Sequence, residues 1–141
     1  MGALININET GENSPFLHAL SSDWEKRKDS CTALGKLLPA SDAFGILIKM
    51  LDDPDTAVEQ EAAEALARFG GIDGIFAVLE ALGRRAEDGD SDYIAYRLRE
   101  LQIFEQLPIL QLARNALDVN SSPFAREGLK QLERILPSHN R

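Results

Sequence analysis

Apolar residues recur along the middle of the chain at the spacing of one face of an α-helix. Pro54 precedes this segment and Gly70 follows it, which are the residues favoured at the first turn and just past the end of a helix. We therefore predict a helix over 54–69. Its apolar residues, which share one helical face and are expected to point inward, are Val58, Ala62, Ala63, Leu66 and Phe69.

The same pattern returns in three other places along the chain. The place of Leu66 is taken by Leu34 in the copy before it, and by Leu101 and Leu132 in the copies after it. Recurrence at a nearly constant spacing of this size is typical of helical repeat proteins. It predicts four equivalent outer helices, at 23–37, 54–69, 92–105 and 122–136.

Three further apolar segments lie between these copies and predict inner helices at 42–52, 72–84 and 107–118. Short turns such as Pro39-Ala40-Ser41 and Gly70-Gly71 connect outer and inner helices. Because short connections between amphipathic helices produce antiparallel hairpins, we predict an all-α, right-handed α-solenoid of about three and a half helical hairpins. We expect the whole chain, 1–141, to form a single domain, with an N-terminal arm and cap at 1–20, repeats at 21–136 and a tail at 137–141.

One copy carries a recognisable motif. It resembles the HEAT-like repeats first noted around phycobilisome lyases, whose pattern reads Asp-x-x-Val-Arg-x-x-Ala-Ala-x-Ala-Leu-Gly. Glu59 stands where that pattern has arginine, whereas the first copy keeps an arginine, Arg27, at the same place. The resemblance implies a superhelix of HEAT-like hairpins, a fold that hosts many functions. The matching residues are Asp55, Val58, Ala62, Ala63, Ala65 and Leu66.

Composition narrows the classes of partner. The chain has 141 residues, 44% hydrophobic and 27% charged, and a formal net charge of -8. An acidic protein is disfavoured as a ligand of nucleic acid or anionic membranes and is compatible with a basic protein partner. The inner helices carry no excess of basic over acidic residues, which also argues against nucleic acid. With one cysteine and no signal-peptide pattern, we expect a cytoplasmic monomer.

Candidate chemistry is sparse. His18 and His139 lie near opposite ends of the chain, and Cys31 falls on the apolar face of its helix, so we interpret Cys31 as a buried small residue. The acidic runs 52–55 and 87–92 do not follow the spacing of a calcium loop, and we interpret the first as a helix cap. We therefore expect no cofactor, no metal and no catalytic activity.

A solenoid of this kind binds partners along the ridge formed by its inner helices. The residues that face away from the buried side of each inner helix are then the candidate partner-binding residues. Trp24, Tyr93 and Tyr96 are either packing residues or anchors at an exposed edge. The candidate residues on the inner helices are Asp42, Ile46, Lys49, Asp73, Glu80, Arg84, Gln111, Arg114, Asn115 and Asp118.

The sequence thus predicts a protein–protein interaction module that binds through its concave or edge surface. Because the chain is small and acidic, an inhibitor or immunity-type protein against a basic toxin or nuclease is one form of this hypothesis. An adaptor or assembly chaperone is another. The resemblance to lyase-associated repeats implies a competing hypothesis, a tetrapyrrole (phycobilin) lyase-like factor or enzyme accessory subunit.

Overall fold

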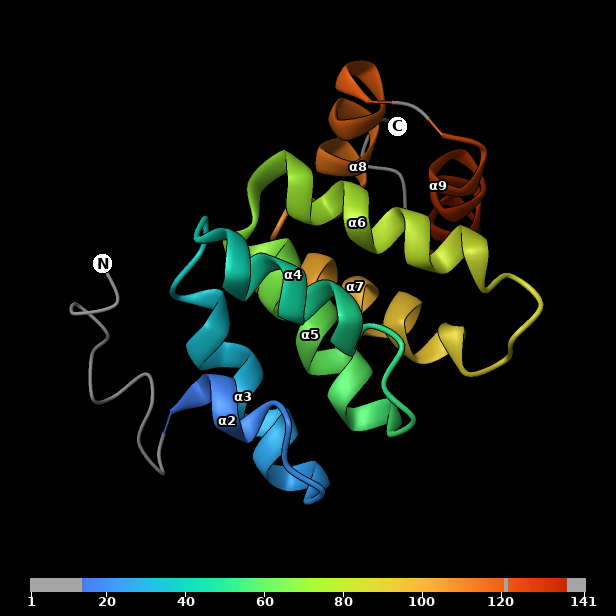
Figure 1. The fold of residues 1–141 in the computed structure, drawn as a ribbon. Coiled ribbons are helices and arrows are strands. Elements are labelled where there is room, and N and C mark those ends of the chain that lie inside the picture. The colour runs from blue at the N-terminus through green and yellow to red at the C-terminus, as the bar shows by residue number, and fades with distance from the viewer. Residues whose placement is uncertain (1–13, 121, 137–141) are drawn as a thin grey trace.

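The computed structural model describes residues 14–120 and 122–136, and its regular structure in these ranges is entirely helical (Figure 1). Each predicted main helix is present, with ends close to the predicted ones, so the all-α solenoid is confirmed. Residues 1–13 of the predicted arm and cap (1–20), and the predicted tail at 137–141, lie outside the described residues. The helices are α2 Pro15–His18, α3 Trp24–Gly35, α4 Ser41–Met50, α5 Thr56–Phe69, α6 Gly71–Arg84, α7 Ser91–Glu105, α8 Ile109–Val119 and α9 Pro123–Ile135.

Aspartates at equivalent repeat positions begin the first two outer helices. The Asp23 carboxylate accepts a hydrogen bond of 2.9 Å from the backbone N–H of Glu25, and Asp55, at the same place in the next repeat, accepts one of 2.9 Å from Ala57. Such caps satisfy a free N–H group and contribute about 1 kcal/mol each. Asp55 therefore acts as the predicted helix cap.

The turn between α5 and α6 depends on its two glycines. The N–H of Gly70 donates to the carbonyl of Leu66 over 2.9 Å and ends α5. Gly71 then has a φ of 63°, a left-handed conformation that glycine adopts without strain. The chain reverses at this glycine pair, as the sequence predicted.

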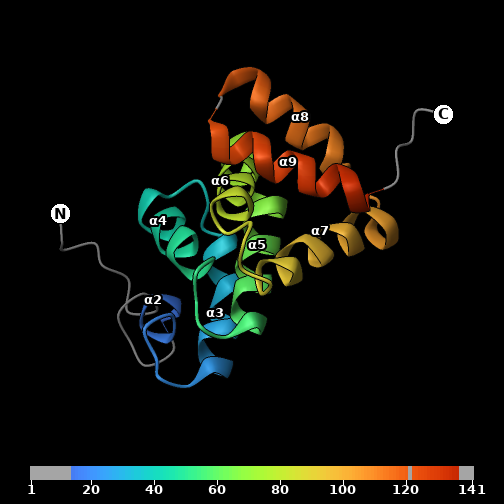
Figure 2. The same cartoon turned by 90° about the vertical axis from the view of Figure 1, so that its right-hand side faces the viewer.

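Outer helices α3, α5 and α7 pack side by side, and α4 and α6 pack against them (Figures 1 and 2). The residues that take the place of Leu66 in the four copies are all buried: Leu34, Leu66, Leu101 and Leu132. One hydrophobic core therefore runs through the repeats, and the repeat period predicted its members.

The last helix departs from the predicted outer position. α9 packs mainly across α6, with less contact to α7, and α8 and α9 lie together over α6 (Figure 2). Two glycines allow this crossing, because a Cβ at Gly83 would overlap the carbonyl oxygen of Phe124 and a Cβ at Gly128 would overlap that of Leu79. The interpretation of 122–136 as a fourth stacked outer helix is thus wrong in its neighbours, since close backbone approach draws α9 onto the second inner helix.

We predict that Gly128→Ala destabilises the protein by about 2–3 kcal/mol, because the new methyl group meets a backbone carbonyl that has little freedom to move. Urea unfolding followed by circular dichroism measures the change. The control is Gly45→Ala in α4, where no atom lies within 4 Å of a new Cβ. That variant gains about 0.5–1 kcal/mol from helix propensity, and equal effects at both positions would contradict the close crossing.

Candidate functional site

The predicted binding residues of the inner helices are accessible. Asp42, Lys49, Asp73 and Arg84 are exposed on α4 and α6, and Glu80 is half-buried. On α8, Gln111, Asn115 and Asp118 are exposed and Arg114 is half-buried. The structure therefore leaves each of these residues at least partly exposed.

Two of these residues form ion pairs with different neighbouring elements. The guanidinium of Arg84 pairs at 3.1 Å with Asp52 at the end of α4, so α4 and α6 are linked at one end. Arg114 instead pairs at 3.0 Å with Glu133 of α9, and Gln111 hydrogen bonds to Asn115 on its own helix. Arg114 thus links α8 to α9, which lie together over α6.

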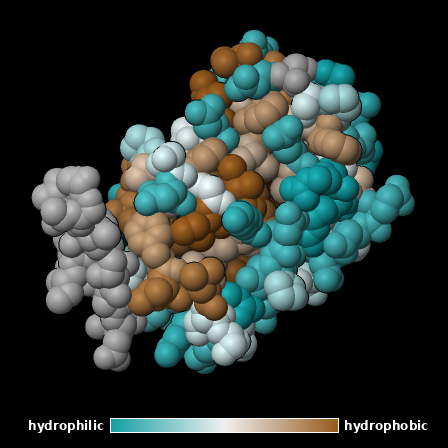
Figure 3. Space-filling view, viewed as in Figure 1, coloured by the Kyte–Doolittle hydropathy of each residue, from teal (hydrophilic) through white to brown (hydrophobic). Residues whose placement is uncertain are grey.

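The middle of the inner face is also more apolar than the sequence interpretation assumed. Phe44, Ile46 and Ile48 of α4 are each only partly buried, so apolar surface remains exposed on this helix. Viewed from this side, hydrophobic residues gather over α2 and α4, and polar residues gather toward the α6–α7 loop (Figure 3). Ile46, predicted to face away from the core, packs against it as a half-buried residue.

Two ion pairs join the hairpin ends at equivalent repeat positions. Arg27 of α3 holds Asp53, just after α4, at 2.8 Å, and Glu59 of α5 holds Arg85, just after α6, at 2.9 Å. Adding 32 to 27 and 53 gives 59 and 85, so the second pair occupies the same places with its charges reversed. Arg85 is therefore the partner that accommodates Glu59 at the position where the repeat motif has arginine.

Burial sets the protonation behaviour of the second pair. The Glu59 side chain is 4% exposed, and one of its two oxygens has no hydrogen-bond partner among the described residues. Burial raises the pKa of the Glu59 carboxyl, and the hydrogen bond from Arg85 opposes that rise. Arg85 also donates to the carbonyl of Leu51 at 2.7 Å and to Asp88 at 3.0 Å, which ties the α6–α7 loop to α4.

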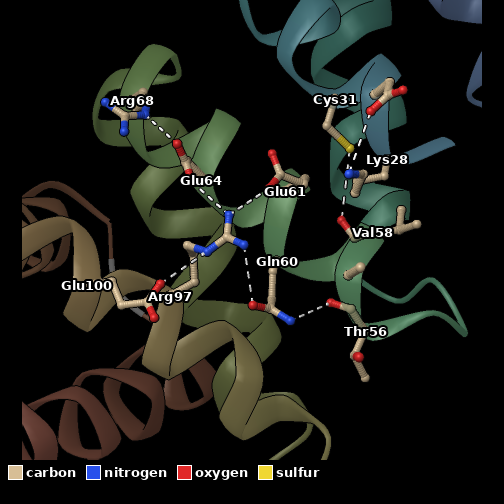
Figure 4. Close-up of polar contacts among 12 residues, drawn as sticks. Lys28, Cys31, Thr56, Val58, Gln60, Glu61, Glu64, Arg68, Arg97 and Glu100 are labelled. Atoms are coloured by element: carbon tan, nitrogen blue, oxygen red, sulfur yellow. Dashed lines mark hydrogen bonds and ion pairs between the residues drawn. The ribbon is translucent and has the colours of Figure 1, made fainter. Parts of the chain in front are cut away.

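A second polar network joins α5 to α7 on the outer side (Figure 4). The Arg97 guanidinium lies 2.9 Å from Glu61 and 2.7 Å from Glu64, and Arg68 bonds to Glu64 at 2.7 Å. Arg68 also pairs with Glu105 at the end of α7. Because arginines hold these carboxylates, the network connects neighbouring repeats and offers no free acid–base pair.

Cys31 is fully buried, as the sequence predicted. Burial raises the pKa of its thiol to about 12, so it remains a thiol at neutral pH and is a poor nucleophile. Its sulfur lies 3.9 Å from the carbonyl oxygen of Val58 (Figure 4). It also lies 4.0 Å from the sulfur of Met50. Within 14–120 and 122–136, no group of His, Cys, Asp and Glu residues is arranged to hold a metal ion.

The outer helices end in exposed apolar residues that share one repeat position. We call Leu37, Phe69 and Phe104 the tip row, because they lie where the outer helices reach the turns. Phe69 lies against Gly35 of the preceding outer helix, and the Arg68–Glu105 pair joins the ends of α5 and α7 beside it. The sequence pattern placed Phe69 on the inward face, and Phe104 holds the equivalent position in the third copy, but Phe104 is 78% exposed and Phe69 is 40% exposed.

A cleft of about 350 Å³ lies between α7, α9 and the loop that precedes α7. Tyr96 contributes to its wall, and Tyr93, one helical turn earlier, is also about half exposed. Trp24 is likewise exposed at the start of α3, where the ammonium of Lys28 lies 5.8 Å from its ring centroid. Of the two alternatives open for these aromatic residues, the structure therefore favours the exposed edge.

The wall that α9 contributes was not predicted. It consists of Glu127, Gln131, Arg134 and Ile135. The sequence contains no signal for it, because it becomes part of a cleft when α9 crosses α6. Among the helices described, none combines the length and the apolar character that crossing a membrane requires.

Comparison with protein families agrees with this architecture. The family model for HEAT repeats matches residues 13–101, which covers more than half of the chain. This protein therefore belongs to the HEAT repeat family. Searches of curated proteins and of solved structures found no significant match.

We predict that Arg27 and Asp53 are energetically coupled. In a double-mutant cycle of Arg27→Ala and Asp53→Ala, we expect a coupling energy of about 1–3 kcal/mol, because the Asp53 side chain is only 8% exposed. The matched control is Arg84 with Asp52, a pair next to Asp53 at the end of α4 whose side chains are 43% and 46% exposed. That cycle should give less than about 1 kcal/mol. Urea unfolding measures both, and equal coupling energies would contradict the prediction.

Proposed function

We propose that this HEAT repeat protein is a monomeric, non-catalytic module that binds a partner protein along its edge. HEAT repeats generally mediate protein–protein interactions, and membership of the family supports this class of function. The observation that carries the proposal is the tip row. Apolar side chains remain exposed at the same place in three successive repeats, and exposed apolar residues in a row are typical of interaction surfaces.

The contacts of the tip row support a preformed surface. Phe69 rests on Gly35, where a Cβ would collide with the aromatic ring. Beside it, Arg68 fixes the end of α5 through Glu64 and the end of α7 through Glu105. Because these contacts hold the helix ends together, a partner meets a surface that needs little ordering on binding.

The net charge of the protein favours one class of partner protein. The net charge of -8 favours a basic partner, since opposite charges speed the encounter of two proteins. An inhibitor or immunity-type protein that neutralises a basic toxin or nuclease is one form of this proposal. An adaptor that holds a basic protein in an assembly is another.

The tetrapyrrole alternative has less support. The cavities described here are lined by neither histidine nor cysteine, whether between α7 and α9, on the outer side at Phe69, or beside Pro39 and Asp73. Cys31 is buried away from all three linings. No observation among the described residues therefore favours a lyase-like role.

Partner capture followed by binding measurements tests the proposal. Tagged protein is incubated with native lysate at low and high salt, and partners are identified by mass spectrometry. We expect a dominant basic protein whose recovery falls at high salt, because rim charges contribute mainly through association. Recovery of a bound small molecule without any protein partner would contradict a protein-binding function.

Phe104→Ser should then weaken the purified partner's affinity by about fivefold or more, since truncating an aromatic anchor costs over about 1 kcal/mol. The control is Val119→Ser, which alters another exposed apolar residue, 66% exposed, at the end of α8. Isothermal titration calorimetry measures both affinities. If Phe104→Ser binds as tightly as the wild type, the tip row is not the contact surface.

A further inference from the structure

The cleft between α7 and α9 exists because α9 crosses α6. Gly83 and Gly128 bring the backbones of α6 and α9 together, and α9 therefore covers little of α7. Tyr93 and Tyr96 consequently remain about half exposed along α7. The open space beside Tyr96 follows from the way the stack of helices ends.

The walls of the cleft combine apolar, aromatic and acidic groups. Ala95 and Ile135 supply apolar surface, and Tyr96, which is about half exposed, supplies an aromatic ring. Glu87 and Asp92 contribute carboxylates from the loop and from the first turn of α7. A long aliphatic side chain with a cationic end matches this set, because its stem packs on apolar surface while its head meets an aromatic ring and carboxylates.

Two carboxylates of the cleft, Glu87 and Asp92, differ from the carboxylates that link the helices and repeats. Asp53, Glu59 and Glu64 are each held by an arginine, at 2.8, 2.9 and 2.7 Å respectively. In the part of the chain that the structure describes, neither Glu87 nor Asp92 takes part in an ion pair, whereas Asp88, between them, is held by Arg85. The cleft thus carries acidic groups whose charges the described part of the protein does not itself neutralise.

One cationic side chain, Arg134, lines the cleft, and its ion pair is weak. Arg134 lies 3.9 Å from Glu127, and its side chain is 67% exposed. Such an exposed pair contributes little energy and is screened by salt. The lining therefore retains an excess of negative charge, with Glu87, Asp92 and Glu127 against Arg134.

We infer that this cleft binds a lysine or arginine side chain within an extended, basic segment of a partner protein. The inference rests on the proposed function, and it assigns the partner's charge to a defined place on the surface. The volume of about 350 Å³ is near the lower end of known ligand pockets, which suits one or two side chains better than a folded domain. The tip row, at the other end of α7, would contact a different part of the same partner.

The first test uses defined peptides as probes. Acetylated nonapeptides of glycine and serine that contain three lysines, three arginines or three glutamines are titrated into ¹⁵N-labelled full-length protein. We expect chemical-shift changes for the lysine and arginine peptides in residues 86–96 and 127–135, and none for the glutamine peptide. Absence of binding by both cationic peptides, or shift changes centred on another surface, would overturn the inference.

Variants of matched charge separate this site from general attraction. Glu87→Gln with Asp92→Asn should weaken binding of the cationic peptides by about tenfold. The control, Glu25→Gln with Asp29→Asn, removes the same charge from exposed positions of α3, and both pairs include an acidic residue of a first helical turn. We expect the control to weaken binding by less than about twofold. Equal losses would mean that net charge alone attracts the peptides and would overturn the inference.

A third variant tests the aromatic wall. Tyr96→Leu keeps apolar bulk and removes the ring, and we expect a loss of affinity of about two- to fivefold. Unchanged affinity would remove Tyr96 from the site and contradict the mixed aromatic and acidic recognition described here. Thermal unfolding of each variant confirms that the fold is intact.

The captured partner distinguishes failure of this inference from failure of the proposed function. If the partner binds the Glu87→Gln/Asp92→Asn variant as tightly as the wild type, the inference fails and the protein-binding function stands. If the protein captures no partner and binds no cationic peptide, both fail.

Discussion

The close crossing of α6 and α9 is the contact on which the C-terminal half of this protein depends. Two glycines without side chains let the backbones approach, and Gln131 adds a hydrogen bond of 3.0 Å to the carbonyl of Leu82. This contact decides that the last helix covers an inner helix and not its outer neighbour. The exposure of Tyr96, the cleft beside it and the pairing of Arg114 with Glu133 all follow from that choice.

Ion pairs on two sides of the helix stack stabilise different contacts. On one side, Arg27–Asp53 and Glu59–Arg85 connect each outer helix to the end of its own hairpin. On the other, Arg97 and Arg68 connect one repeat to the next. Glu87 and Asp92 belong to neither set of contacts, so their charges remain available to a partner at the cleft.

The sequence predicted the helices well because their signals are local or periodic. The burial of Leu66 and its equivalents was predictable because the helical period and the repeat spacing mark the same positions. The Asp55 cap was predictable because it contacts Ala57, only two residues further along the chain. Periodicity assigned Phe104 to the buried face but gives no information on whether a neighbouring helix reaches that far. Phe104 lies at the end of α7, shortly before Gln106 adopts a left-handed conformation, and remains exposed.

The candidate site was predicted less well, since its parts meet only through tertiary contacts. Gly83 and Gly128 read in the sequence as ordinary small residues, and nothing local indicates that they face each other's helices. Tyr96 and Ile135 are far apart in the chain and share a cleft because of that contact.

The reversed polarity of the two hairpin-end ion pairs also restricts how the repeat array can change in length. If one whole repeat, 28–59, were lost, Arg27 would come to face Arg85, and two cations would meet in a partly buried position. If the same segment were duplicated, Glu59 would face a copy of Asp53, and two anions would meet. Loss and duplication of this repeat would thus each bring two like charges together. The reversed polarity of the two ion pairs therefore disfavours any change by one in the number of repeats.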